Sequence, residues 1–171
     1  MRLILTDRAL RVAVPDDGKT AYVDLTTRKI ARCVGCFGCW TRTPGRCVIR
    51  DDATRIYPRI ARSDTLLYVS RIRYGGYDTV MKTMLERAIP VQQAFIRVVD
   101  GETHHEQRAV VPKRATIVAY GAETSDEQEL FRQLVARNAR NMNFTEHRVL
   151  FVRENEVDDT VKQLIATWER S

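Results

Sequence analysis

The chain has 171 residues, a length typical of one domain that can bury a hydrophobic core. Its 44% hydrophobic and 29% charged residues are typical of a soluble globular protein. No apolar run approaches the ~18 residues that a membrane-spanning helix needs, and charged residues interrupt the apolar start too early for a signal peptide. We therefore expect a cytoplasmic protein without membrane contact, in which cysteines stay reduced.

The net charge of +6 raises the question of a polyanionic partner such as nucleic acid. Most of the basic residues are arginines, and they are scattered along the whole chain. No dense basic run contains aromatic residues, as nucleic-acid-binding segments often do. The scatter is typical of a solvated surface, so we expect no nucleic-acid partner.

In chain order, short apolar strands alternate with amphipathic helices. The predicted strands are residues 2–6, 21–25, 65–70, 115–120 and 149–152. The predicted helices are residues 52–62, 78–88, 123–141 and 156–170. Between the first two strands, Pro15 and Gly18 leave room for at most two helical turns, so the first helix is expected to be short or absent.

This alternation predicts a single α/β domain over residues 1–171, a doubly wound three-layer sandwich. Its five-stranded parallel sheet is expected in the order 2-1-3-4-5, with ligands at the carboxyl ends of strands 1 and 3. We expect helix 123–141 to turn Leu130, Leu134 and Val135 inward. Residues 95–113 are expected to be irregular, with His104 and His105 on the surface.

All four cysteines lie in one loop, residues 33–47, with the spacing C-x2-C-x2-C-x7-C. They are Cys33, Cys36, Cys39 and Cys47. Four thiolates in one short loop suit a tetrahedral zinc ion or an iron–sulfur cluster. Free thiols or a thiol redox switch fit the same spacing, so both alternatives stay open. We expect the loop at the same sheet edge as the ligand site.

Several motifs together resemble a known family. The cysteine motif is followed by Gly-x-Cys-x-Ile-x-Asp-Asp (45–52), and the third strand by Tyr-Gly-Gly-Tyr (74–77) and a helix with Lys82 and Glu86-Arg87. This pattern resembles the flavodoxin-like NADPH-dependent FMN reductases, above all their cysteine-bearing branch, which includes the iron–sulfur flavoproteins. The resemblance covers residues 30–121 by motif and the whole chain by strand order.

The resemblance implies FMN at the switch point, a 4Fe–4S cluster on the four cysteines, and NAD(P)H as the electron donor. The residues expected to bind FMN are Thr6, Arg8, Ser70, Arg71, Arg73, Tyr74, Gly75, Gly76, Tyr120 and Gly121. The family pattern also implies a homodimer and a small-molecule or protein electron acceptor. The chain departs from the pattern after the first strand, where Asp7 replaces the glycine-containing loop that holds the FMN phosphate. Arg8 or Arg11 is expected to hold the phosphate instead.

Two functions follow as competing predictions. The first is an FMN-dependent, NAD(P)H-using oxidoreductase or electron-transfer flavoprotein, with an iron–sulfur cluster on the cysteine loop. The alternative is a non-enzymatic flavodoxin-like protein that has lost FMN and keeps a zinc site or a thiol redox switch.

Overall fold

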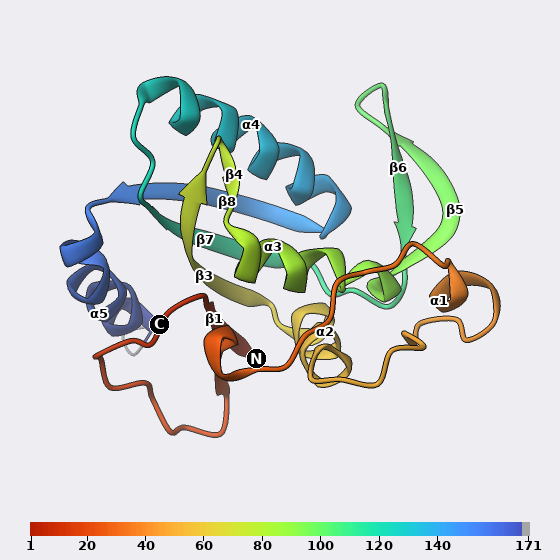
Figure 1. Ribbon diagram of the computed structural model, residues 1–171, viewed down its shortest axis with the longest axis horizontal. Coiled ribbons are helices and arrows are strands. Elements are labelled where there is room, and N and C mark those ends of the chain that lie inside the picture. Colours follow the sequence, from red (N-terminus) through yellow and green to blue (C-terminus); the bar gives the residue numbers. More distant parts are fainter. Residues whose placement is uncertain (169–171) are drawn as a thin grey trace.

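A computed structural model of the chain describes residues 1–168. Its central parallel sheet has the order β2-β1-β3-β7-β8 (Figure 1). These strands are β1 (Arg2–Thr6), β2 (Thr20–Asp24), β3 (Thr65–Arg73), β7 (Lys113–Tyr120) and β8 (Phe144–Val152). The short β4 (Gly76–Tyr77) pairs antiparallel with the end of β3. The predicted order 2-1-3-4-5 is confirmed.

Helices cover both faces of this sheet (Figure 1). On one face lie α2 (Ala53–Arg62), α3 (Thr79–Glu86) and α4 (Ser125–Asn141), which share one apolar core with the sheet. On the other face, α5 (Val157–Trp168) packs on a second apolar cluster. The predicted continuation of this helix to residue 170 lies outside the described residues. Within residues 1–168, no helix is long and apolar enough to cross a membrane.

The connection between β1 and β2, residues 7–19, contains no helix. An extended segment takes the helix's place and packs Leu10, Val12 and Val14 beside α5. The Leu10 N–H donates to the Tyr22 hydroxyl, and the Arg11 N–H donates to Asp158. These bonds partner backbone groups that a helix would otherwise satisfy internally. The expectation of a short or absent first helix is confirmed.

Residues 92–107 form a hairpin, although residues 95–113 were expected to be irregular. Strands β5 (Gln92–Val99) and β6 (Glu102–Gln107) pair antiparallel. The turn residues Asp100 and Gly101 both have positive φ, at 50° and 78°. An Asp-Gly pair is a common hairpin turn because such turns need positive φ at both positions. The expectation of an irregular segment is wrong because this Asp-Gly turn lets the residues on either side pair as strands.

Two side-chain predictions near this hairpin are wrong. His104 is buried, and its ring bonds Asn141 and Glu102, so it is not a surface histidine. In α4, the buried stripe is Phe131, Val135 and Ala139, at i, i+4 and i+8. The expectation for Val135 is therefore confirmed, whereas Leu130 and Leu134 flank the stripe and are 53% and 36% exposed.

Lys113 is buried at the start of β7, where its ammonium donates to the Val111 carbonyl. Burial lowers its pKa to about 8 from the ordinary 10.5, against the opposing effect of Asp64. The folded protein therefore holds this proton more weakly than the unfolded chain. We therefore expect the free energy of unfolding to increase as pH rises from about 8 to 10.5, because Lys113 loses its proton in the folded state first.

Urea unfolding of the wild type and Lys113→Met across this pH range measures the effect. The variant should lack that gain and should be more stable than the wild type at pH 7. Lys162→Met, which replaces an exposed lysine on α5, is the control and should follow the wild type. Equal pH slopes for the wild type and Lys113→Met would contradict the prediction.

Candidate functional site

At the carboxyl ends of the central strands, the Asp7 carboxylate is the shared hydrogen-bond acceptor. Its Oδ2 accepts from Ser70 Oγ at 2.8 Å and from the Arg71 N–H at 2.7 Å, and its Oδ1 accepts from Tyr120 Oη at 2.9 Å. Asp7 directly follows β1, Ser70 and Arg71 lie near the end of β3, and Tyr120 ends β7. The place expected for the FMN phosphate, at the carboxyl ends of β1 and β3, thus already holds a carboxylate of the chain itself.

The charges around Asp7 are also partnered within the chain. Burial raises the pKa of Asp7, although the hydrogen bonds from Arg71, Ser70 and Tyr120 oppose that rise. Arg8 lies 3.8 Å from the Glu154 carboxylate and 3.9 Å from the Asp158 carboxylate, and its guanidinium lies over the Tyr120 ring. The Ser70, Arg71 and Tyr120 donors are all bound to Asp7, and Arg8, one of the two arginines expected to hold the FMN phosphate, is also partnered. A phosphate dianion does not fit beside Asp7 in this arrangement.

The loop after β3 projects beyond this edge. Tyr74 is 81% exposed and has a φ of 53°, a conformation that is uncommon for a bulky residue. Gly75, with a φ of 71°, lies beneath Leu130 of α4, and a Cβ added there would meet Leu130 Cδ2 at 2.5 Å. The glycine is therefore needed for its backbone conformation and for contact with Leu130. Leu130 therefore covers this side of Gly75.

Residues expected to bind FMN do gather at one edge of the sheet. Thr6, Ser70, Arg71, Tyr120 and Gly121 lie at the ends of β1, β3 and β7, and Arg8 lies over Tyr120. Arg73 to Gly76 form the projecting loop instead, with the Arg73 guanidinium over the Tyr74 ring. Thr6 Oγ1 is buried without a hydrogen-bond partner in the described part of the chain. Flavin binding by these ten residues stays a prediction.

Asp7→Asn tests the internal carboxylate. Because the folded-state pKa of Asp7 is raised, ionisation opposes folding, and this cost appears as pH rises above the ordinary value of 3.8. The variant should therefore gain stability relative to the wild type between pH 4 and neutrality, as measured by thermal unfolding. Asp17→Asn is a control of opposite sign, because hydrogen bonds from Lys19 and Thr20 lower the pKa of Asp17. A constant difference between Asp7→Asn and the wild type across this pH range would show that the carboxylate carries no such cost.

The four-cysteine loop is the second candidate site. Cys33 and Cys36 are exposed, Cys47 is half-buried, and Cys39 is buried in α1 (Gly38–Thr41). All four line one small cavity of about 30 Å³. Among residues 1–168, no three Cys, His, Asp or Glu side chains are arranged to ligate one metal ion. Binding a metal centre therefore requires the cysteine side chains to rearrange.

The electrostatics of the loop favour a cationic centre. Burial raises the pKa of the Cys39 thiol, and the neighbouring Cys47, Cys33 and Cys36 raise it further. Thiolates gathered in this cavity would repel one another, and a bound cation would relieve the repulsion. The donor set therefore fits zinc or iron in its chemistry.

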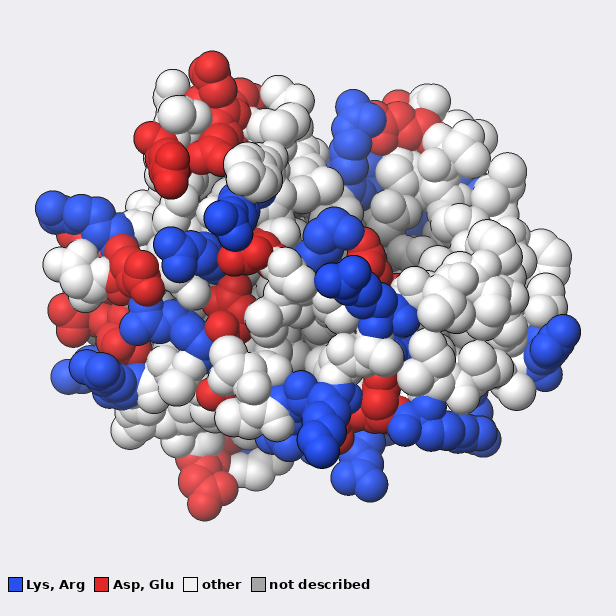
Figure 2. All heavy atoms as spheres, viewed as in Figure 1, with Lys and Arg blue, Asp and Glu red and all other residues white. Residues whose placement is uncertain are grey.

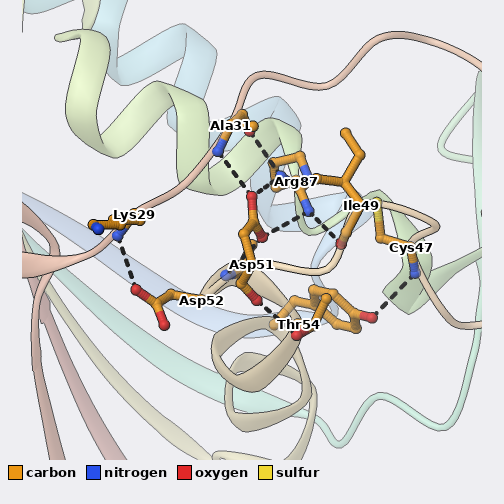
Figure 3. Close-up of polar contacts among 10 residues, drawn as sticks. Lys29, Ala31, Cys47, Ile49, Asp51, Asp52, Thr54 and Arg87 are labelled. Atoms are coloured by element: carbon orange, nitrogen blue, oxygen red, sulfur yellow. Dashed lines mark hydrogen bonds and ion pairs between the residues drawn. The ribbon is translucent and has the colours of Figure 1, made fainter.

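A buried ion pair anchors this loop (Figure 3). The Arg87 guanidinium is 1% exposed and binds the Asp51 carboxylate through two bonds, of 2.6 and 2.9 Å. It also donates to the carbonyls of Ala31 and Ile49, on either side of the cysteines. Burial alone would lower the pKa of Arg87, but Asp51 and the nearby Cys47 raise it. The two ends of the loop are thus tied to one side chain.

Asp51 completes this anchor. Its Oδ2 accepts from the Ala31 N–H at 2.8 Å, and its Oδ1 accepts from the Ala53 N–H at the start of α2. Burial would raise its pKa, but the bonds from Arg87 and Ala31 lower it overall. Neither Arg87 nor Asp51 was predicted as a site residue, although both belong to the motifs that carry the family resemblance.

The cysteine loop was expected to lie at the same sheet edge as the ligand site, but the structure places it elsewhere. Its cavity is lined by Arg87 and Ile89, just beyond the carboxyl end of α3, whereas the loop after β3 precedes the start of that helix. Trp40 of α1 donates to the Ile89 carbonyl and contacts the His105 ring of β6. Figure 1 shows α1 beside the β5–β6 hairpin, on the other side of α3 from β4. The two candidate sites are separated by the length of α3.

No family model matches the chain. It is 25% identical over 92 residues to an iron–sulfur flavoprotein of Methanocaldococcus jannaschii, covering 54% of this chain and 47% of that protein. It is 29% identical over 86 residues to an iron–sulfur flavoprotein of Archaeoglobus fulgidus, covering 50% of this chain and 38% of that protein. The matched part is thus less than half the length of either relative.

Solved structures with the same fold include an azoreductase, with a TM-score of 0.59 and 10% identity over 97% of this chain and 93% of that one. Another is an FMN-dependent NADH-azoreductase of Bacillus anthracis in complex with FMN, with a TM-score of 0.58 and 8% identity over 98% and 96% of the two chains. Identities this low establish the fold alone. The resemblance expected from the sequence is confirmed: the chain has the flavodoxin-like fold and is similar, over about half its length, to two iron–sulfur flavoproteins.

Proposed function

We propose that this protein is an oxidoreductase of the iron–sulfur flavoprotein type that transfers single electrons through its four-cysteine loop. The observation that carries the proposal is that Cys33, Cys36, Cys39 and Cys47 line one cavity, in a loop whose two ends are bound by Arg87. The names of the sequence relatives support iron–sulfur rather than zinc as the occupant. When bound, a 4Fe–4S cluster would supply one-electron transfer.

The chain's own residues have distinct roles in this proposal. The four cysteines would hold the cluster, and the Arg87–Asp51 pair fixes both ends of the loop. Arg87 Nε is buried and has no hydrogen-bond partner in the described residues. A cluster sulfur atom, or the thiolate of the nearby Cys47, would provide the acceptor that Arg87 Nε lacks. Hydrogen bonds and positive charge near such sulfur atoms raise the reduction potential by stabilising the reduced cluster.

FMN is not assigned a step in this proposal, because Asp7 and Arg8 do not fit its phosphate. NAD(P)H as electron donor, a homodimer and a protein or small-molecule acceptor remain predictions. Exposed apolar residues lie in the cysteine loop and on β5, and they include Phe37, Phe95 and Val98. In Figure 2 the surface over α1 and the β5–β6 hairpin is largely uncharged. Such a surface is typical of a protein-contact region, here beside the proposed electron-transfer site.

Anaerobic reconstitution of the whole chain with iron and sulfide tests the function. The expected result is about four irons per chain, with a broad visible absorption that bleaches on reduction. Flavin and zinc are measured in the same preparation before reconstitution. Bound zinc that iron does not replace, or four titratable thiols without iron, would instead support the non-enzymatic alternative. Cys33 and Cys36 are both exposed, which suits a thiol redox switch. A disulfide between them after oxidation would support this alternative.

A further inference from the structure

A groove separates α3 from α4 on the larger helical face of the sheet, and no role has yet been assigned to it. Its volume is about 680 Å³, within the range of small-molecule sites. Its apolar lining includes Tyr68 of β3, Tyr77 of β4, Leu85, Leu134, Met142 and Phe144. The groove is also lined by Arg73, Tyr74 and Gly76 of the loop that was expected to bind FMN, but by neither Asp7 nor the cysteine loop. Its occupancy is therefore independent of the proposed electron transfer through the cysteines.

Tyr68 gives this groove a specific polar feature. The residue is 2% exposed, and its hydroxyl has no hydrogen-bond partner in the described residues. A buried hydroxyl without a partner costs free energy, so such groups are rare in folded proteins. Burial raises the pKa of Tyr68, so the hydroxyl keeps its proton and remains a donor. A molecule that brings an acceptor oxygen to Tyr68 Oη would remove this cost.

The polar groups at the groove rim are mostly occupied already. Lys82 pairs with Glu86 on α3, and the Gln92 side chain donates to the Asn141 carbonyl. Two further charged residues line the groove: the Arg73 guanidinium lies over the Tyr74 ring, and the Asp78 carboxylate accepts from the Thr79 N–H. The Tyr77 ring packs edge-on against Phe131 at 4.8 Å, which gives the groove a rigid aromatic wall. Stacking and apolar contact would supply most of the affinity.

From this geometry we infer that the groove between α3 and α4 binds a small, uncharged aromatic molecule whose carbonyl oxygen accepts a hydrogen bond from Tyr68. The aromatic body lies among Tyr77, Leu134 and Phe144. The carbonyl accepts the hydrogen bond that Tyr68 Oη lacks in the free chain; because this hydroxyl is buried, the side chains above it move aside on binding.

The test is a fluorescence titration of the whole chain with Prodan, a naphthalene that carries a ketone and changes its emission on leaving water. We expect saturable binding of one molecule per chain. Tyr68→Phe should weaken binding roughly 2- to 12-fold, the value of one hydrogen bond. In the free protein the same change should leave thermal stability unchanged or raise it, because it removes an unpartnered hydroxyl. Equal affinity of the wild type and Tyr68→Phe would overturn the inference.

A matched pair of α4 variants separates the groove from the rest of the surface. Leu134→Glu places a charge in the groove and should weaken Prodan binding about tenfold or more. Ala136→Glu places the same charge on the exposed side of α4, outside the lining of the groove, and should leave the affinity unchanged. Sedimentation of each variant at the titration concentration gives its oligomeric state. If Prodan does not bind the wild type and Leu134→Glu dissociates an oligomer, a second copy of the chain covers the groove and the inference is wrong.

Discussion

Replacing Cys47 by serine is expected to remove the iron–sulfur cluster as completely as replacing Cys36. The two residues differ in their surroundings, because Cys36 is exposed, whereas Cys47 is half-buried and its N–H donates to the Tyr57 hydroxyl at 3.2 Å. If all four thiolates are ligands, each substitution removes one quarter of the same ligand set. The expected result after anaerobic reconstitution is loss of most iron from either variant.

Thr41→Ser is the control on the same loop. Its hydroxyl donates to the Phe37 carbonyl, and serine can keep that bond. This variant should bind as much iron as the wild type. Iron and sulfide per chain are measured together with the absorption spectrum. Full iron content in Cys47→Ser, with loss in Cys36→Ser, would leave only the Cys33, Cys36 and Cys39 group as ligands and would contradict a four-cysteine cluster.

The strand order could be predicted from the sequence because each central strand is a short apolar run. Residues 65–70 and 115–120 are both bounded by polar or glycine positions, and both are buried in the sheet. The absence of the first helix could be predicted as well, because Pro15 and Gly18 are turn signals within the connecting segment itself. Signals that depend on neighbouring residues in the chain were therefore sufficient for the architecture.

The internal partners of the candidate sites could not be predicted in this way. Asp7 and Tyr120 are 113 residues apart, and their hydrogen bond exists only because parallel strands bring both to one edge. Asp51 and Arg87 are 36 residues apart, and neither position has a local pattern that indicates pairing. Long-range polar contacts of this kind follow from the packed fold.

The predicted position of the cysteine loop was wrong for a related reason. The loop was expected near the carboxyl end of the second strand, because it follows that strand in sequence. Residues 28–32 instead carry the chain past α2 to the far end of α3, where the Lys29 and Ala31 N–H groups donate to Asp52 and Asp51. An irregular segment can span about 3.3 Å per residue, so its length alone leaves its end point open. The contact with Arg87 decides where the loop lies.

Arg87→Met is expected to lower the free energy of unfolding by about 3–5 kcal/mol, the range typical of breaking a buried ion pair. The substitution leaves the Asp51 carboxylate without its cation and the carbonyls of Ala31 and Ile49 without their side-chain donor. Lys82→Met on the same helix breaks the exposed pair with Glu86 and should cost less than about 1 kcal/mol. Urea unfolding of both variants measures the difference.

The double variant Arg87→Met with Asp51→Leu identifies the source of the loss. If the unpaired carboxylate is the main cost, the double variant should be less destabilised than the sum of the two single variants, because no charge is left without a partner. Loosening the loop should also expose Cys39, so its thiol should react faster with a labelling reagent in Arg87→Met than in the wild type. An unchanged Cys39 labelling rate together with an unchanged free energy of unfolding would mean that the ion pair does not anchor the loop. Loss of stability with unchanged labelling would confine the role of Arg87 to the helical core.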